Sequence, residues 1–190
     1  APTFTVETPQ GETLTLTRQL RMASRYQDLL YLSYQNESSI HVYDSVSLQS
    51  RFEIPFSDQL GILKDFAVSE SGDVVYVDSN GDLVLHGLGN APGTKSLLLD
   101  QVDAATVAIA GGTLVFASEN SLFSMPLAPV APTFEVALPA GIAIPDLAVD
   151  AATNTAYVLV EDEGIRPYVL GSGSLQEALP LTTSAASVVV

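Results

Sequence analysis

Three adjacent carboxylates form the densest acidic site of the sequence, in the segment Glu161-Asp162-Glu163-Gly164. The segment stands between two predicted strands. Several carboxylate oxygens on one turn are the ligand type that the cofactor Ca²⁺ prefers. From the residues alone a solvated turn is favoured, because neighbouring side chains at the end of a strand point to opposite faces, and calcium ligands among Glu161, Asp162 and Glu163 are the alternative.

A second acidic segment, Asp78-Ser-Asn-Gly-Asp82, has the spacing found at the start of a calcium-binding loop. It lacks the glutamate that completes such a loop. Asn-Gly between two alternating runs is the strongest short-range signal of a β-hairpin. The sequence therefore favours a hairpin turn here.

No residue arrangement typical of nucleophilic catalysis is present in the sequence. There is no Gly-x-Ser-x-Gly segment, and the absence of cysteine excludes thiolate nucleophiles, thiolate zinc sites and disulfides. His41 stands in an alternating run, which predicts an outward-facing strand residue. Arg18, Arg21 and Arg25 have the chemistry to hold a phosphate, but in so acidic a chain they are predicted to neutralise nearby carboxylates.

The charge balance is strongly acidic: the 190 residues include 7 Lys and Arg against 22 Asp and Glu, a net charge of −15. Such a surface repels phosphate backbones and anionic lipid, so neither nucleic acid nor a membrane surface is expected as a partner. Apolar residues make up 47% of the chain, enough for a hydrophobic core. No apolar stretch approaches the ~20 residues that span a bilayer. The composition favours a secreted or periplasmic protein.

The elements that must position these residues are β-strands. Helical periodicity is nearly absent from the sequence. Short runs of β-branched and aromatic residues, such as 73–77, 113–117 and 155–160, are bounded by Gly, Asn, Asp and Ser. We therefore predict an all-β fold.

The predicted strands repeat with a period of about 40 to 45 residues. One aromatic residue recurs per unit, with spacings of 45, 40 and 41, at Tyr31, Tyr76, Phe116 and Tyr157. A small residue stands eight or nine positions before each of them, at Ala23, Ala67, Ala108 and Ala148. Four short strands in a unit of this length are typical of a β-propeller blade, and a β-sandwich with evenly spaced turns is the alternative.

We predict a β-propeller with four-stranded antiparallel blades. The blades are expected over approximately 18–56, 62–100, 104–139 and 144–181. The small residues are expected on the innermost strands, where strands crowd together, and the aromatic residues between neighbouring blades.

The two ends of the chain resemble parts of one further blade. Residues 1–9 match residues 131–139, the predicted outer strand of the third blade, at six of nine positions. Residues 185–190 follow the predicted inner strand of the fourth blade by about 40 positions. We predict orphan strands at 3–9 and 185–190, and an incomplete or truncated propeller whose unpaired strand edges recruit another strand.

Two segments resemble the β-propeller phytases, calcium-dependent phosphatases of bacteria. The segment 33–44 is similar, without gaps, to a family segment, and the matching residues are Ser33, Gln35, Ser38, Ser39, Tyr43 and Asp44. The segment 157–165 is similar to a family strand that ends in clustered acids. The resemblance implies that Gln35 binds substrate near a phosphate-bound calcium, and that Glu161, Asp162 and Glu163 include calcium ligands.

Two departures separate the chain from a working phytase. The family's acidic segment precedes its glutamine segment, whereas the order is reversed here. The family's Asp-rich loop corresponds to residues 55–61, in which Asp58 is the single acid. The resemblance therefore implies an accessory propeller domain of a secreted phytase-like protein, which assists phytate hydrolysis by a neighbouring catalytic domain.

Two other functions remain open from the sequence: a calcium-dependent phytase in its own right, and a generic protein-interaction propeller. The expected partners are a downstream catalytic propeller domain, or another copy of the chain through strand edges. An inositol phosphate is the expected ligand.

Overall fold

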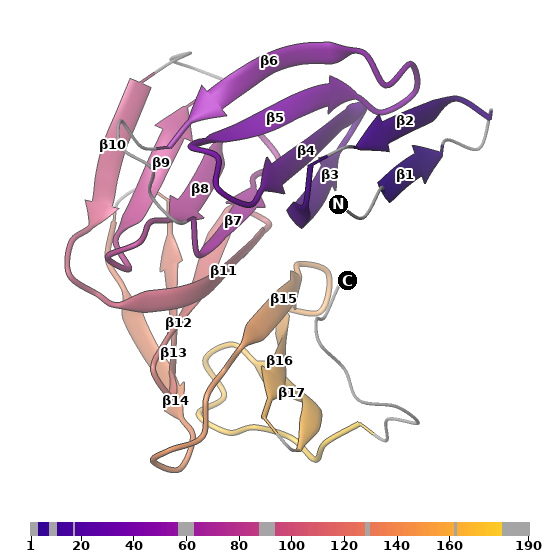
Figure 1. Cartoon of the computed structure of the whole chain (residues 1–190). Helices are drawn as coiled ribbons and strands as arrows, with labels where there is room; N and C mark the ends of the chain where they lie inside the picture. Colours follow the sequence, from indigo (N-terminus) through magenta and orange to yellow (C-terminus); the bar gives the residue numbers. More distant parts are fainter. Residues whose placement is uncertain are drawn as a thin grey trace. The chain divides into compact units, whose positions relative to one another are not determined.

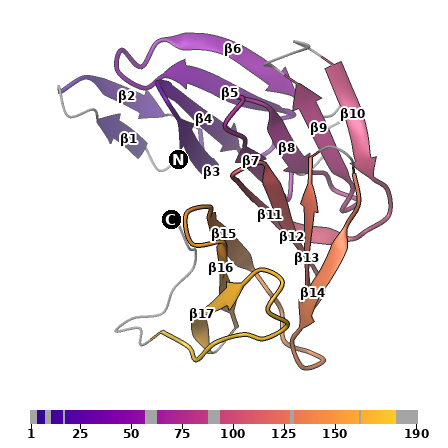
Figure 2. The same cartoon turned by 180° about the vertical axis from the view of Figure 1, so that it is seen from behind.

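The computed structural model describes residues 4–7, 11–16, 18–56, 63–87, 94–127, 130–161 and 163–179. These residues form antiparallel β-sheets and no helix, as Figures 1 and 2 show from opposite sides. The prediction of an all-β fold is confirmed. The chain divides into two compact units, Ala1–Leu63 and Lys64–Val190. No helix of the length and apolar character needed to cross a membrane occurs in the described part of the chain.

The first unit contains a two-stranded hairpin and a four-stranded sheet. The hairpin consists of β1 (Phe4–Glu7) and β2 (Thr13–Leu16). The sheet consists, in spatial order, of β3 (Leu20–Tyr26), β4 (Leu29–Tyr34), β5 (Ser39–Asp44) and β6 (Ser50–Pro55). Each strand pairs antiparallel with the next one along the chain, which is the topology of a propeller blade.

The N-terminal segment differs from its prediction as an orphan strand over 3–9. Strand β1 lies within this segment and pairs with β2 from Phe4↔Leu16 to Glu7↔Thr13. The alternating Thr and Leu residues of β2 form a strand of their own, and pairing with a sequence neighbour closes only a short loop, which costs little chain entropy. The other predicted orphan strand, 185–190, lies outside the described residues.

The second unit contains three further antiparallel sheets. The first consists of β7 (Asp65–Val68), β8 (Val74–Val77), β9 (Leu83–Gly87) and β10 (Thr94–Leu99). The second consists of β11 (Ala104–Ala110), β12 (Thr113–Ser118), β13 (Ser121–Pro126) and β14 (Thr133–Ala137). The third consists of β15 (Asp146–Asp150), β16 (Thr155–Val160) and β17 (Gly164–Val169).

The first strands of these three sheets are neighbours: β11 lies between β7 and β15 (Figure 1). They carry the repeated small residues Ala67, Ala108 and Ala148. A short side chain at these positions lets the strands approach closely. In the first unit the corresponding Ala23 lies on β3.

The last sheet has three strands where four were predicted, the fourth being expected within 176–181. An isolated bridge and backbone hydrogen bonds hold residues 175–179 beside β17 without a regular strand. Gln176 N donates to Pro167 O at 2.8 Å, but Pro167 has no N–H with which to return a bond. The Gln176 carbonyl instead accepts a hydrogen bond from Arg166 Nε at 2.9 Å. Residues 180 and 181 lie outside the described part.

Apolar layers lie between consecutive sheets of the second unit. The layer between the first two sheets contains the buried residues Ala67, Val75, Val77, Leu83, Ala104, Val107, Leu114, Phe116 and Met125. The layer between the second and third contains Val115, Ala117, Leu122, Leu138, Ile144, Leu147, Ala156, Val158, Val160 and Tyr168. Strand β12 contributes alternate residues to both layers, so both faces of its sheet are buried and the strand reads as a continuous apolar run.

Three of the four repeated aromatic residues are buried, with exposed fractions of 0% for Tyr31 and 2% for Tyr76 and Phe116. Tyr157 is only half-buried, contrary to the prediction. Phe116 pairs opposite Val107, the residue before the repeated Ala108. Tyr157 pairs opposite the repeated Ala148 itself. This offset of one residue turns the Tyr157 side chain to the other face of its sheet.

A buried carboxylate joins the inner strands β7 and β11. Asp65 Oδ2 accepts hydrogen bonds from Thr106 Oγ1 at 2.6 Å and from Val107 N at 2.8 Å, and Oδ1 accepts one from Phe66 N at 2.8 Å. Burial raises the pKa of Asp65 to about 6, and the nearby charge of Asp146 also raises it. The three hydrogen bonds lower the pKa but do not cancel the effect of burial. Because both oxygens have donors, the cost of burying the acid is partly offset.

Phe116→Ala tests the apolar layers. The ring of Phe116 stacks on Phe123 with 5.2 Å between centroids, and removing it leaves a cavity. We expect the free energy of unfolding, measured by urea denaturation, to fall by about 3–5 kcal/mol. Phe134→Ala is the matched control, because Phe134 is 58% exposed and its loss should cost about 1 kcal/mol or less. Equal losses for the two variants would contradict the assignment of Phe116 to the core.

Asp65 makes stability depend on pH. Its pKa in the folded state, about 6, lies above the ordinary value of 3.8, so the folded protein binds this proton more tightly than the unfolded chain. The stabilisation that the protonated Asp65 gives the folded state is fully present below pH 3.8 and is lost as the pH rises through about 6. We expect the stability of the wild type relative to Asp65→Asn to decline across this window, by up to about 1.4 kcal/mol per pH unit. Urea denaturation at a series of pH values measures this difference, and a pH-independent difference would refute it.

Candidate functional site

His41 is the centre of a charged cluster in the first unit. It lies on β5, is 7% exposed, and pairs directly opposite Glu53 of β6. Its Nδ1 is 3.2 Å from Glu53 Oε1, and its Nε2 is 2.5 Å from Oε2 of Glu37, which lies in the turn between β4 and β5. The imidazole is thus held between two carboxylates, one at each ring nitrogen.

Arg18 and two tyrosines complete the cluster. Arg18 Nη1 is 2.9 Å from Glu37 Oε1, and its guanidinium carbon is 5.7 Å from the centroid of the Tyr34 ring. The Tyr34 ring also meets the His41 ring edge to face, with 5.1 Å between centroids. The hydroxyls of Tyr34 and Tyr43 are 3.4 Å apart. Burial, followed by this hydroxyl contact, raises the pKa of Tyr34 well above its usual 10.0, so its hydroxyl stays protonated.

A pocket of about 280 Å³ opens beside this cluster, and we call it the His41 pocket. Its lining residues are Leu14, Thr15, Arg18, Tyr34, His41, Tyr43, Ser50 and Glu53. The side chains of Arg18 and Glu53 are 54% and 57% exposed. The pocket therefore offers hydroxyls, a guanidinium and a carboxylate to a polar ligand that enters from solvent.

The position of His41 corrects the sequence interpretation of an outward-facing strand residue. Its face of β5 carries polar neighbours, but Tyr34 and Glu37 cover the ring. The contact with Glu53 depends on the register between β5 and β6, which no local pattern reveals. The prediction for Arg18, that it neutralises a carboxylate, agrees with its ion pair to Glu37.

Gln35, Glu161 and Glu163, which the family resemblance assigned to substrate and calcium, are not among the residues that line the His41 pocket. Gln35, of the first unit, is exposed in the turn after β4. Glu161 and Glu163, of the second unit, are exposed in the turn between β16 and β17, where Glu163 Oε2 is 3.1 Å from Arg166 Nη1. Asp162 lies outside the described residues. Within the described ranges no group of three His, Cys, Asp or Glu is placed to hold a metal ion, and the calcium site stays a prediction.

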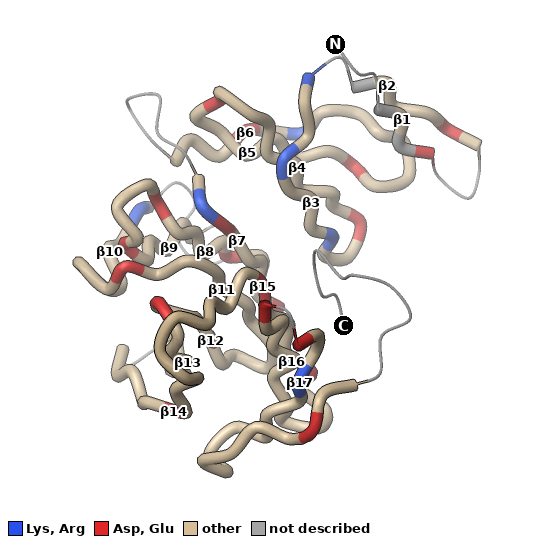
Figure 3. The backbone as a smooth tube through the Cα atoms, turned by 60° about the horizontal axis from the view of Figure 1, so that its bottom comes forward, with Lys and Arg blue, Asp and Glu red and all other residues tan. Residues whose placement is uncertain are grey.

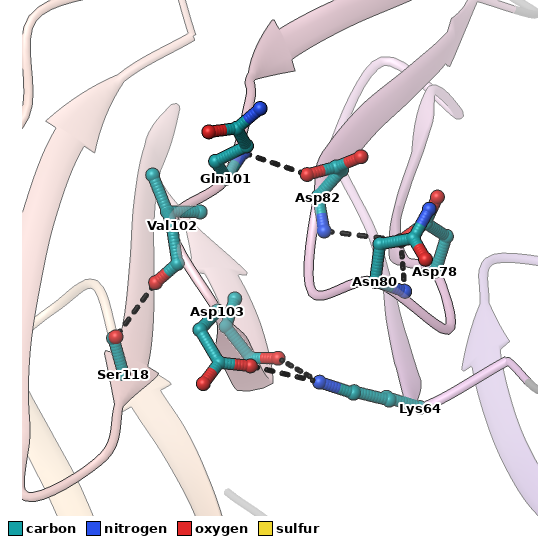
Figure 4. Close-up of polar contacts among 9 residues, drawn as sticks. Lys64, Asp78, Asn80, Asp82, Gln101, Val102, Asp103 and Ser118 are labelled. Atoms are coloured by element: carbon teal, nitrogen blue, oxygen red, sulfur yellow. Dashed lines mark hydrogen bonds and ion pairs between the residues drawn. The ribbon is translucent and has the colours of Figure 1, made fainter.

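A second polar cluster surrounds the turn between β8 and β9 (Figure 4). This turn is a hairpin turn, as predicted. Asp78 Oδ1 accepts hydrogen bonds from the backbone N of Asn80 at 2.8 Å and of Asp82 at 3.0 Å. Gly81 has a φ of +84°, and a Cβ there would lie 2.6 Å from the Cα of Asp103. Only glycine fits both conditions.

Asp82 also ties the loop that faces this turn to it. Asp82 Oδ1 accepts a hydrogen bond from Gln101 N at 2.7 Å, and Lys64 Nζ is 3.2 Å from Asp103 Oδ1 (Figure 4). The space between turn and loop, about 380 Å³, is lined by Asn80, Asp82, Asp100, Gln101 and Asp103. Because Asp82 holds a backbone amide and Asp103 holds the lysine, the first role of these two carboxylates is architectural.

Neither a known protein family nor a curated protein sequence matches this chain. Solved structures do. Hsv2 of Kluyveromyces lactis is 14% identical with a TM-score of 0.64, over 91% of this chain and 56% of that protein. The dihydro-heme d1 dehydrogenase NirN, in complex with DHE, is 19% identical with a TM-score of 0.63, over 90% of this chain and 39% of that protein. Apo AztD of Citrobacter koseri is 14% identical with a TM-score of 0.63, over 89% of this chain and 61% of that protein.

These likenesses confirm the predicted fold class: the chain is an all-β propeller built from antiparallel blades. The chain spans between 39% and 61% of the length of the three proteins. At such low identity the likeness shows the fold alone, and one fold serves many functions. The likeness to these structures does not show that the chain belongs to a phytase family.

His41→Ala tests whether the charged cluster holds the first unit together. The variant leaves two carboxylates without the imidazole and removes the ring that packs on Tyr34, so we expect a loss of about 2–4 kcal/mol in the free energy of unfolding. Glu53→Gln is the control, because that side chain is 57% exposed and an exposed pair contributes about 1 kcal/mol or less. Chemical denaturation measures both. A His41→Ala variant as stable as the wild type would show that the cluster does not contribute to the free energy of unfolding.

Proposed function

We propose that this chain is a binding propeller, an accessory domain of a secreted phytase-like protein that assists phytate hydrolysis by a neighbouring catalytic domain. The observation that carries the proposal is the His41 pocket. Its hydroxyls and guanidinium suit a phosphorylated polyol, while the charged groups around it are bound to one another.

The pairing within the pocket favours binding over catalysis. A general base needs a free lone pair within reach of the proton it removes, but both nitrogens of His41 face carboxylates. Glu37 is shared between His41 and Arg18. Tyr34, with its raised pKa, holds its proton. These four side chains form one chain of contacts with no free member to serve as nucleophile or base.

The distribution of charge also favours the first unit as the site for an anionic ligand. Ala1–Leu63 contains four basic and seven acidic residues, and Lys64–Val190 contains three basic and fifteen acidic residues. Figure 3 colours the charged residues of the described part along the backbone. A polyanion is repelled by the second unit. Arg18 presents a half-exposed guanidinium at the pocket, and a guanidinium matches phosphate oxygens bidentately.

Calcium is part of the same proposal. The turn that contains Glu161 and Glu163 is exposed, and we propose that it takes Ca²⁺ together with Asp162. We propose a substrate contact for Gln35 on the ground of the family resemblance alone. The proposed protein partner is a downstream catalytic propeller domain, with self-association through strand edges as the alternative.

Binding and turnover of inositol hexakisphosphate separate the accessory domain from the enzyme. We expect calorimetry with the 190-residue chain, with and without Ca²⁺, to show saturable binding. We expect Arg18→Ala to weaken it by about 10- to 100-fold, because a charged hydrogen-bonded pair contributes about 1.5–3 kcal/mol. Phosphate release, measured in parallel, should stay at the background level.

Arg21→Ala is the matched control: Arg21 is exposed on β3 and does not line the His41 pocket. Equal weakening by the two arginine variants would place the ligand elsewhere. No binding by the wild type would refute the accessory function. Phosphate release that disappears in Glu163→Gln would instead establish a calcium-dependent phytase.

A further inference from the structure

Both ring nitrogens of His41 face carboxylate oxygens, and a neutral imidazole cannot donate to both. Nε2 lies 2.5 Å from Glu37 Oε2, and Nδ1 lies 3.2 Å from Glu53 Oε1. A neutral ring carries one N–H, so its other nitrogen would present a lone pair to a carboxylate, whereas the imidazolium donates from both nitrogens. Because an imidazole is more basic than a carboxylate, the second proton of this arrangement belongs to the ring. The geometry therefore suits the charged form of His41.

The charge of His41 decides whether the cluster beside the His41 pocket is negative or neutral. Apart from the imidazole, the cluster consists of one cation, Arg18, and two anions, Glu37 and Glu53. Its net charge is therefore −1 with a neutral ring and 0 with the imidazolium. A negative cluster repels an anionic ligand, and a neutral cluster does not.

The other groups that line the pocket beside the ring do not change charge near neutral pH. Tyr34 and Tyr43 are phenols, which ordinarily titrate well above this range, and burial raises the pKa of Tyr34 further. Strand β2 contributes Leu14 and Thr15, which do not ionise, to the lining. Imidazole is the side chain that ordinarily changes charge between pH 5 and 8. Among the described residues of the cluster and the lining, His41 is therefore the group that changes charge in this range.

Glu37 transmits the charge of His41 to the guanidinium at the pocket. One oxygen of Glu37 lies 2.9 Å from Arg18 Nη1, and the other faces His41. When His41 is protonated, it shares the negative charge of Glu37, so Arg18 is held less tightly and its 54% exposed side chain can meet a ligand. When His41 is neutral, Glu37 is left to Arg18 alone, and the charge of Glu53 at the pocket is not compensated.

We infer that His41 is a pH-sensitive switch for ligand binding: the pocket accepts a polyanion while His41 is protonated and binds it weakly once the ring loses its proton. The ligand class is a compound with several phosphate- or sulfate-type groups, whose oxygens match a guanidinium. By linkage, the bound anion and the proton on His41 strengthen each other's binding equally. The inference rests on the proposed binding function of the pocket and adds its regulation.

Myo-inositol hexakissulfate is the probe, because sulfate esters keep their full charge between pH 5.5 and 8, whereas phosphate groups titrate near pH 6. We expect calorimetry with the 190-residue chain to show affinity that falls about tenfold or more from pH 5.5 to pH 8. Net proton uptake on binding, seen as a dependence of the heat on the buffer, should accompany it. His41→Gln keeps a hydrogen-bonding side chain but carries no titrating charge, so its affinity should be equal at both pH values.

Two control variants separate His41 from other groups that titrate in this range. His86→Gln removes the other histidine, which lies on β9 of the second unit, and Asp65→Asn removes the acid whose pKa is about 6. Both variants should keep the pH dependence of the wild type. A wild-type affinity that does not change with pH, or a dependence that persists in His41→Gln, would overturn the switch and leave the binding function standing.

Nitrogen-15 NMR of the His41 ring tests its charged form without any ligand or variant. We expect protons on both ring nitrogens at pH 5.5 and the loss of one of them by pH 8. A ring with one proton throughout this range would refute the switch, whatever the probe does. Absence of binding at every pH would refute the proposed function of the pocket, and the switch with it.

Discussion

Burial of both faces of its sheets is the constraint on which the second unit depends. Strand β12 places Phe116 in one apolar layer and Val115 and Ala117 in the next. A shift of one residue in its pairing would exchange these two sets. Register is therefore specified by packing on two sides at once. Pairing is irregular at residues 175–179 beside Pro167, and the register between β11 and β12 shifts between Ala104 and Thr106.

The same burial decides what the many acidic residues do. Glu135 is 8% exposed, and its Oε2 accepts hydrogen bonds from the Tyr168 hydroxyl at 2.8 Å and from Gly171 N at 2.7 Å, which ties β14 to the loop after β17. Asp150 holds its own turn, and the Thr153 hydroxyl, followed by the Ala152 amide, lowers its pKa. Carboxylates that secure sheets and turns account for part of the acidity, so a net charge of −15 is not by itself evidence of a cation site.

The fold was predictable from the sequence because each blade repeats a local pattern of short apolar strands and Gly-containing turns. The contacts that depend on pairing between strands were not predictable. His41 meets Glu53, twelve positions away, only because β5 and β6 pair in one register, and Tyr157 differs from Phe116 by one position of register. The pocket was missed for the same reason: its lining comes from β2, β4, β5, β6 and Arg18 between β2 and β3, and no single segment carries its signal.

The charged cluster of the first unit is the site that we propose for ligand binding. In the second unit Asp65 and Glu135 link neighbouring elements of the apolar sheets, where a carboxylate with satisfied oxygens serves the architecture. In the first unit, ion pairs link Arg18, Glu37, His41 and Glu53 beside a solvent-accessible pocket. An apolar core of the same volume would avoid the cost of desolvating these charges. Departures from the apolar pattern are expected at functional sites, which is why we propose this cluster as the binding site.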